Sequence, residues 1–409
     1  MREAYIVQAV RTPGCRRARG AFNQTRPEDL LKTALNGLME RAGVDKKEVE
    51  DILVGCAFPE AEQGLNIGRI IAQMCGFPDD TCGAVVNRFC SSGLEAIALQ
   101  TSRILSGWCE VAIGAGLESM SIVPMGGNLP RPHPEWAREN PNVYISMGMT
   151  AENVAQRYDI TREMQDAFAV SSNKKAAAAQ EKGLFTEIVP TPAVKYVEKG
   201  GEWVKTVTMQ TFDDGVRADT TMEGLAKLKP AFSNANPWVK NCGSVTAGNS
   251  SQTTDGAAAT LVMSGEAVKR LGVKPIAKIK AYAVAGCRAD EMGVGPRYAI
   301  PKVLKIAGMT IDDMKKDGIF EINEAFASQA LYCARELGIG DEELWSHESD
   351  KRIINVNGGA IALGHPLGCT GAKLAATLVT NMQRLGKKYG IESMCIGGGM
   401  GAAAIFELC

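Results

Sequence analysis

The chain has 409 residues, of which 45% are hydrophobic and 22% charged, and its 45 basic residues nearly balance its 46 acidic ones. This length and composition are typical of a globular protein with two or three packed units. The balance of charge excludes binding of nucleic acid or of an anionic membrane through overall charge, so an anionic ligand has to be held by local groups. There is no run of 18 apolar residues, and we expect no membrane span.

The ends of the chain and its cysteines indicate where the protein is located and whether it binds a metal. The N-terminus enters a strand-like apolar run at once, which leaves no room for a signal or transit peptide, and the C-terminal AIFELC carries no peroxisomal tripeptide. We therefore expect a cytoplasmic protein. None of the twelve cysteines forms a CxxC pair, which argues against structural zinc or a redox pair, and we expect no metal.

Apolar, β-branched runs at 4–10, 52–58, 84–87 and 111–116 predict strands with helices between them. One helix begins at Pro27 and is stopped by Gly43. The pattern changes at about 120–250, where a proline-rich loop, two helices (150–158 and 162–182) and a polar stretch (197–221) follow one another. We interpret this segment as an insertion, and insertions of that size usually carry ligand or oligomer contacts.

The alternation resumes with apolar runs at 277–286, 317–322, 353–357 and 393–397, and it predicts an α/β architecture with buried sheets. Three segments of the first half resemble three of the second in the same order: EAYIVQAVR and KAYAVAGCR, DILVGCAF and GIFEINEAF, EVAIGAGLES and SMCIGGGMGA. This indicates a duplicated α/β half. The alternative is that short apolar strands look alike in any protein.

Cys90 follows the strand-like AVVN, and SSG then opens a helix with apolar residues on one face. A cysteine at a helix N-terminus can have its pKa lowered below the usual value, because free amides and the helix dipole favour a thiolate. We therefore expect a nucleophile at this position. The alternative is a buried structural cysteine at a strand end.

Of the three histidines, His133 and His347 stand in loop-like segments and have the pattern of surface residues. His365 instead lies in Gly-His-Pro, between glycine-rich turns and the start of a helix. Fixed there, it can activate a thiol or donate a hydrogen bond to an oxyanion. The alternative is a loop histidine with satisfied hydrogen bonds.

Two further sites carry polar groups at strand ends. Cys395 ends a strand and is followed by three glycines from Gly397, which suit backbone amides exposed to a ligand oxygen, or else a tight hairpin. Asn323 stands where a strand meets a helix, where it can orient a water or polarise a carbonyl, or simply cap the helix.

Four segments together resemble the signatures of the thiolase family: VNRFCSSGLEAI, NEAFA, GGAIALGHPLGCTGA and CIGGGMGAAAIFE. MTAENVA, KLKPAF and SVTAGNSSQTTDGAAA are similar to the middle region of the same family, so the resemblance extends essentially from end to end. It implies two α/β halves layered α-β-α-β-α, with a loop domain inserted in the first. We place the N-terminal half at 1–265, with the insertion at about 120–250, and the C-terminal half at 273–409.

The resemblance also implies the chemistry, which is the cleavage of a 3-ketoacyl-coenzyme A by coenzyme A. Cys90 would carry the acyl group, Cys395 would be the acid–base thiol, and His365 would activate Cys90. His365 and a water held by Asn323 would stabilise the enolate oxygen, while the backbone amides of Cys90 and Gly397 would form a second oxyanion hole. The two thiols would have pKa values near neutrality and exchange roles.

For coenzyme A, a co-substrate and not a tightly bound cofactor, the resemblance implies contacts with Met147, Arg217, Phe232, Ala247, Ser251, Ala325 and Phe326. The alternative for Arg217 is a solvated surface charge. Acetoacetyl-specific biosynthetic members carry a histidine where this chain has Ser146, which favours a degradative 3-ketoacyl-CoA thiolase. Family members form homo-oligomers, so we expect a dimer or a tetramer.

Two rival classes share this fold. A ketoacyl synthase would need a second histidine or an asparagine beside the cysteine and would not need Cys395, and a non-catalytic acyl-CoA-binding protein would lack one of the catalytic groups. We also expect that Cys90 and Cys395 can form a reversible disulfide under oxidation.

Overall fold

The computed structural model describes residues 2–232 and 243–409, so that part of the expected insertion, 233–242, lies outside the described residues. The strands are β1 (Ala4–Arg11), β2 (Cys15–Arg16), β3 (Asp51–Gly55), β4 (Cys82–Val86), β5 (Val111–Ser119), β6 (Thr191–Lys199), β7 (Glu202–Gln210), β8 (Thr254–Ser264), β9 (Ala277–Gly286), β10 (Gly318–Ile322), β11 (Tyr389–Ile396) and β12 (Met400–Leu408).

The α-helices are α1 (Pro27–Ala42), α2 (Ile67–Met74), α3 (Ser92–Leu105), α4 (Pro134–Glu139), α5 (Met147–Arg157), α6 (Arg162–Glu181), α7 (Met222–Ala226), α8 (Gly265–Leu271), α9 (Gly295–Ala307), α10 (Ile311–Asp317), α11 (Ala327–Glu336), α12 (Ala360–Leu363) and α13 (Thr370–Leu385). Two short 3₁₀ turns matter for the site, η3 (Phe89–Ser91) and η8 (Leu367–Cys369).

The strand pairings show that the α/β unit is duplicated. In the first half β3 is parallel to β5, β5 is antiparallel to β8, and β8 is antiparallel to β1. In the second half β10 is parallel to β11, β11 is antiparallel to β12, and β12 is antiparallel to β9. The corresponding strands β1 and β9, β3 and β10, and β5 and β11 carry the three pairs of similar sequences, so the duplication predicted from them is confirmed.

The strand expected at 353–357 is wrong. Where the first half has β4, the second has only an isolated parallel bridge between Phe320 and Ile354. Asn355 replaces the missing ladder, because its side chain accepts from the backbone N–H of Ile322 at 2.8 Å and donates to the carbonyl of Ile322 at 2.9 Å. Its backbone φ of 46° turns the chain away from the sheet.

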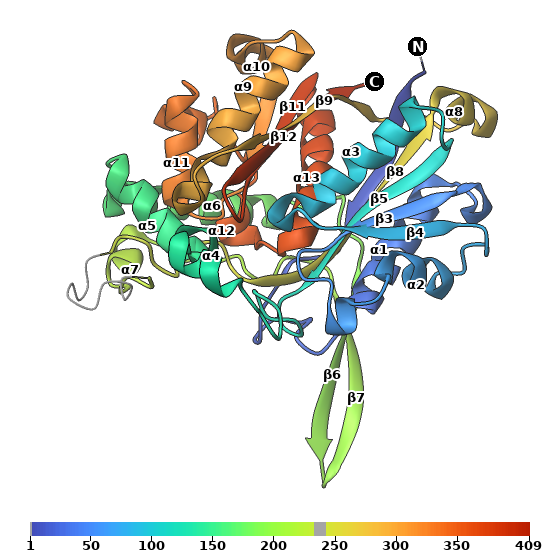
Figure 1. Cartoon of the computed structure of the whole chain (residues 1–409), viewed down its shortest axis with the longest axis horizontal. Helices are drawn as coiled ribbons and strands as arrows, with labels where there is room; N and C mark the ends of the chain where they lie inside the picture. The colour runs from blue at the N-terminus through green and yellow to red at the C-terminus, as the bar shows by residue number, and fades with distance from the viewer. Residues whose placement is uncertain (1, 233–242) are drawn as a thin grey trace.

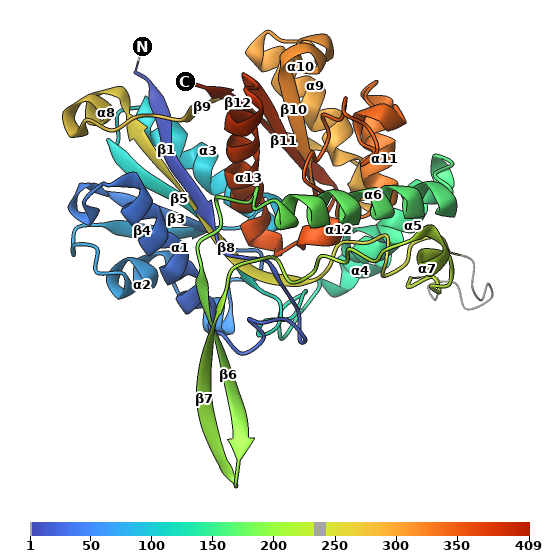
Figure 2. The same ribbon diagram turned by 180° about the vertical axis from the view of Figure 1, so that it is seen from behind.

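The two half-sheets meet where β1 pairs with β9 at Ile6 and Ala277, which gives the continuous order β10-β11-β12-β9-β1-β8-β5-β3-β4. Figures 1 and 2 show α1 and α2 outside the first half-sheet, α9, α10 and α11 outside the second, and α3 and α13 between them. Separate apolar cores fill these spaces. The expected α-β-α-β-α layering is therefore confirmed.

The central helices α3 and α13 approach closely through two glycines. A Cβ at Gly93 would lie 2.5 Å from the backbone nitrogen of Ala372, and one at Gly371 would overlap the backbone nitrogen of Leu94. Each helix follows a 3₁₀ turn, η3 or η8, and these turns end the segments that contain Cys90 and His365. The duplication thus brings the starts of two helices together in the middle of the molecule.

The segment between β5 and β8 carries α4 to α7 and a long hairpin. Helices α5 and α6 confirm the two helices expected there. The hairpin of β6 and β7, which overlaps the polar stretch at 197–221, projects from the body of the molecule (Figures 1 and 2). Of the helices in the described ranges, none has the length and apolar character needed to cross a bilayer.

Candidate active site

Cys90 lies in the turn between β4 and α3. The preceding residue, Phe89, has a φ of 42°, a left-handed conformation that costs a non-glycine residue about 1 kcal/mol or more. Neighbouring side chains hold this turn: the Asn87 Oδ1 accepts from the N–H of Phe89 at 2.8 Å, and the Ser92 hydroxyl donates to its carbonyl at 2.7 Å. The backbone thereby places the Cys90 sulfur directly before the helix.

The electrostatics of Cys90 differ from the expectation. Burial raises the pKa of its thiol to about 12, while the backbone N–H groups of Gly397 and of Cys90 itself act in the opposite direction. The prediction of a thiolate stabilised by the helix N-terminus is therefore wrong for the resting site, because the loss of hydration outweighs these amides. A resting thiol needs a base to become a nucleophile.

His365 is fixed by its backbone. Its N–H donates to the carbonyl of Gln252 and to the Thr254 hydroxyl, both at 3.1 Å. Gly364 has a φ of 83° and packs so tightly on Thr254 that a Cβ there would overlap the threonine side chain. The position of the imidazole is thus set by a turn that admits only glycine.

The hydrogen bonds of the His365 ring define its tautomer. The Thr370 hydroxyl donates to the carbonyl of Pro366 at 3.1 Å, so it accepts from the Nδ1–H of His365, 2.6 Å away. The Nε2 atom then carries a lone pair and lies 3.4 Å from the amide nitrogen of Asn323. Burial, with a smaller contribution from the charge of Lys373, lowers the pKa of His365 to about 3. The ring is neutral, as a base has to be.

Asn323 connects the histidine to the strand that carries the second thiol. Its backbone N–H donates to the carbonyl of Ser393 at 2.9 Å, two residues before Cys395. Its Oδ1 atom is buried and has no hydrogen-bond partner within the described ranges. Helix α11 is capped by Phe326, so the capping role considered for Asn323 is wrong.

Cys395 is completely buried near the end of β11. Its pKa is raised well above the ordinary value, first by burial and then by the charge that a Cys90 thiolate would carry. The prediction that both thiols titrate near neutrality is therefore wrong. Gly398 and Gly399, with φ values of 83° and 91°, turn the chain into β12, and Gly397 faces Phe89.

Four of the seven residues expected to contact coenzyme A gather beside Cys395. Ala325, Phe326, Met147 and Phe232 belong to one apolar cluster with the Cys395 sulfur. The rings of Phe232 and Phe326 meet edge to face, with centroids 6.0 Å apart. This cluster forms an apolar wall on the side of the site where the segment between β5 and β8 lies.

The other three lie further out. Ser251 is half-buried and donates its backbone N–H to the carbonyl of Ala325 at 3.0 Å, which ties it to the apolar wall. Ala247 and Arg217 are exposed, and the backbone of Arg217 is held by the Asn173 side chain at 3.1 Å. Neither of them forms a hydrogen bond to Cys90 or Cys395 within the described residues, and their roles stay predictions.

Three buried polar residues that support the site were missed. Thr370 orients the imidazole, Lys373 donates to the backbone before His365, and Glu118 accepts the N–H groups of Ala57 and Gly368, each at 2.8 Å. The sequence contained a signal for these residues. Thr370 and Lys373 stand within the apolar helix that follows His365, and Glu118 stands at the end of the apolar run of β5. Such residues need partners when they are buried.

Comparisons with known proteins identify the family of the chain. The family described as thiolase, N-terminal domain, matches residues 4–266, and thiolase, C-terminal domain, matches residues 273–408. The 3-ketoacyl-CoA thiolase of Bacillus subtilis is 47% identical over 100% of both chains. Two crystal structures have a TM-score of 0.85 and 36% identity over 100% of this chain: the Bacillus anthracis acetyl-CoA acetyltransferase, covered to 99%, and the dimeric peroxisomal thiolase of Saccharomyces cerevisiae, covered to 98%.

The two family matches together cover nearly the whole chain, and a relative is similar over its full length. The chain therefore belongs to the thiolase family.

Proposed function

We propose that this enzyme is a 3-ketoacyl-CoA thiolase, which transfers an acyl group to coenzyme A and releases acetyl-CoA. The observation that carries the proposal is a neutral imidazole, His365, held by Thr370 and Asn323 in a site that also contains two buried thiols. The relative with the same activity in its name is similar over its full length.

In the first half-reaction, Cys90 attacks the 3-keto carbon of the substrate. Because the resting pair is a neutral thiol and a neutral imidazole, the proton moves from Cys90 to His365 as the sulfur–carbon bond forms. The backbone N–H groups of Cys90 and Gly397 bind the resulting oxyanion, and each such donor contributes about 3–4 kcal/mol to the transition state.

The bond between the α-carbon and the keto carbon then breaks. The acetyl-CoA enolate keeps its negative charge on the thioester oxygen, which His365 and a water on Asn323 stabilise. The Cys395 thiol protonates the enolate carbon, and acetyl-CoA leaves with the acyl group still on Cys90.

In the second half-reaction, the Cys395 thiolate takes the thiol proton of coenzyme A. The coenzyme sulfur attacks the acyl-Cys90 thioester, and Cys90 leaves and recovers its proton from His365. The shortened acyl-CoA is released and both cysteines return to thiols, which gives ping-pong kinetics. The same steps run backwards form a carbon–carbon bond.

The exposed Ser146, in place of a histidine, supports a degradative enzyme active in β-oxidation. The alternative is an acetoacetyl-CoA-forming enzyme, since the structure of the Bacillus anthracis acetyl-CoA acetyltransferase is as similar to this chain as that of the yeast thiolase. Cleavage by coenzyme A should be measured on 3-ketoacyl-CoA substrates from four to sixteen carbons. Efficient cleavage of the long substrates supports the degradative subtype, cleavage of acetoacetyl-CoA alone supports the alternative, and no cleavage at any length contradicts both.

The variant Cys90→Ala tests the nucleophile, and the chain supplies a matched control. Cys369 is also buried, ends η8 before α13 as Cys90 precedes α3, and also has its pKa raised to about 12. We expect Cys90→Ala to abolish cleavage and Cys369→Ala to retain it. Loss of activity in both variants would point to misfolding and not to chemistry.

We further propose a cytoplasmic homo-oligomer. In the described ranges β4 pairs only with β3 and ends the sheet, and a free edge of this kind can pair with a second copy. The dimer named in the yeast structure supports this assembly. The mass by analytical ultracentrifugation distinguishes monomer, dimer and tetramer, and cell fractionation tests the location.

A further inference from the structure

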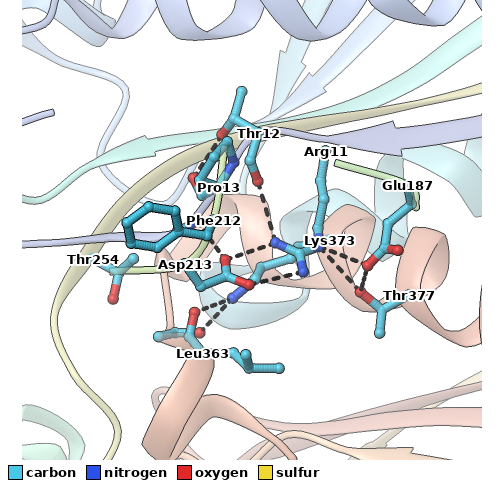
Figure 3. A network of polar contacts seen from close by, with 12 residues as sticks. Arg11, Thr12, Pro13, Glu187, Phe212, Asp213, Thr254, Leu363, Lys373 and Thr377 are labelled. Atoms are coloured by element: carbon cyan, nitrogen blue, oxygen red, sulfur yellow. Dashed lines mark hydrogen bonds and ion pairs between the residues drawn. The ribbon is translucent and has the colours of Figure 1, made fainter. Parts of the chain in front are cut away.

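Four charged side chains form a buried network beside the His365 segment (Figure 3). The Arg11 guanidinium donates to both carboxylate oxygens of Asp213, at 2.7 and 3.0 Å, and to Glu187 at 3.0 Å. Lys373 is the fourth member, and each of the four side chains is less than 5% exposed. Two cations and two anions thus balance within the protein interior.

Lys373 uses its hydrogen bonds in an unusual way. Its ammonium donates to the backbone carbonyls of Leu363 and Gly364, the latter at 2.9 Å. These are the last two residues before His365. Figure 3 shows the Lys373 ammonium beside the Asp213 carboxylate. The charged group therefore binds the turn that leads into the histidine and is not paired directly with an acid.

We propose that Lys373 is a positioning residue for His365: its ammonium, balanced by Asp213, fixes the turn through the carbonyls of Leu363 and Gly364 and places a positive charge beside the imidazole. The inference rests on the proposed role of His365 as the base. A small displacement of such a base is costly, because about 1 Å of misplacement can reduce a rate about 100-fold.

The charges around Lys373 are consistent with this role. Burial lowers its pKa to about 8, and the groups that face it are Asp213 and Glu187, which favour the ammonium, Arg11, which opposes it, and Cys369. Lys373 therefore remains largely protonated at neutral pH. It is the charged group identified as lowering the pKa of His365, while the polar contacts of the ring, Asn323 and Thr370, are neutral.

The network also links this turn to the segment between β5 and β8. Asp213 follows β7 by three residues and accepts the N–H of Gly14 at 2.6 Å, while Glu187 precedes β6 and accepts from Thr377 of α13 at 2.8 Å. The base of the projecting hairpin is thus anchored on both sides to the charges that hold the His365 turn.

The test compares Lys373→Met with Lys373→Met/Asp213→Asn, in which removal of one cation and one anion keeps the buried network neutral. The single variant Asp213→Asn measures the effect of removing the Asp213 charge by itself. Lys175 is the matched control, since it is also buried, donates to two backbone carbonyls (Trp345 and Ile354) and has its pKa lowered to about 8. It does not contact the His365 turn.

We expect kcat of the double variant to fall about 10- to 100-fold, the KM for coenzyme A to change less than about twofold, and the acid limb of the pH profile to move up by about one unit. Lys175→Met should show the wild-type pH profile. If Lys373→Met does not fold, the double variant decides. A wild-type kcat and pH profile in the double variant, or the same changes in Lys175→Met, would overturn the proposal.

The ¹⁵N spectrum of the three histidines separates this inference from the proposed function. In the wild type at neutral pH we expect His365 as one tautomer with the proton on Nδ1, and in the double variant we expect averaging between the two ring nitrogens. If His365→Asn retains full activity, the role of His365 as base fails, whereas unchanged His365 signals in the double variant contradict the positioning role itself.

Discussion

Thr370 provides the sharpest test of how the imidazole is held. Replacing it with valine keeps the shape of the side chain but removes the oxygen that accepts from the Nδ1 atom of His365 at 2.6 Å. The residue is 1% exposed, so water has little access to the abandoned N–H group. An unsatisfied buried donor costs about 1–3 kcal/mol.

The expected change in Tm of Thr370→Val follows from the size of the chain. An unfolding entropy of about 2.1 cal/mol/K per residue gives about 0.9 kcal/mol/K for 409 residues, so a loss of about 2 kcal/mol lowers Tm by about 2 °C. The effect on catalysis should be larger. With neither tautomer favoured, the Nε2 atom is no longer always the free base, and we expect kcat to fall about 100- to 1,000-fold.

Thr101 allows the two effects to be separated. It is also buried, lies in α3 and donates to the carbonyl of Ile97 four residues earlier at 2.8 Å, as Thr370 does to Pro366. Steady-state cleavage and thermal unfolding should be measured for Thr370→Val, Thr370→Ser and Thr101→Val. We expect at most a small loss of Tm in Thr101→Val, which leaves no buried donor unpaired, and loss of kcat in Thr370→Val alone, with Thr370→Ser near the wild type. Wild-type kcat in Thr370→Val would refute the assigned tautomer.

Three further predictions concern buried acids and thiols. The carboxylate of Glu392 has no hydrogen-bond partner in the described residues, and Glu392 lies opposite Glu321 in the β10–β11 ladder, where burial raises the pKa of Glu321 to about 8. Because these pKa values are raised in the folded state, the protein loses stability as the pH rises from about 4.5 to 8. Glu392→Gln should therefore raise Tm at pH 8 but not at pH 4.5. Equal shifts of Tm at both pH values would contradict this. Mass spectrometry should detect an acyl adduct with 3-ketoacyl-CoA in the wild type and none in Cys90→Ala. After peroxide treatment, peptide mapping should find a Cys90–Cys395 disulfide, and full activity in peroxide would exclude it.

Much of the architecture could be predicted because each half repeats a simple pattern. Buried strands such as β5 and helices such as α1 carry apolar residues at the spacing that their burial requires. The hairpin of β6 and β7 was missed because most of its side chains are exposed and no buried face imposes an alternation. Its signal was the glycine pair at Gly200 and Gly201, whose φ values of 62° and 88° suit a two-residue turn.

The segments that carry the candidate residues could be recognised in the sequence, but the electrostatics of the thiols could not be predicted. Cys90, Cys395, Asn323 and His365 stand in recognisable segments, and the structure confirms that Cys90 lies just before helix α3, which begins at Ser92. Sequence position suggested a lowered thiol pKa, but the pKa depends on burial by residues far along the chain. Lys373 was missed for the same reason, since its acceptors follow from the fold of the turn and not from its own neighbours in the helix.

The close crossing of α3 and α13 at Gly93 and Gly371 limits how this enzyme can move. The two helix backbones are in direct contact, and they lie next to a sheet that runs through both halves. The halves therefore have no flexible connection about which they could separate around Cys90. Motion that admits a long acyl chain therefore has to occur in the covering loops, while the seam between the halves stays rigid through every turnover. A methyl group at either glycine would push the facing helix away, so both positions have to remain glycine for this seam to close.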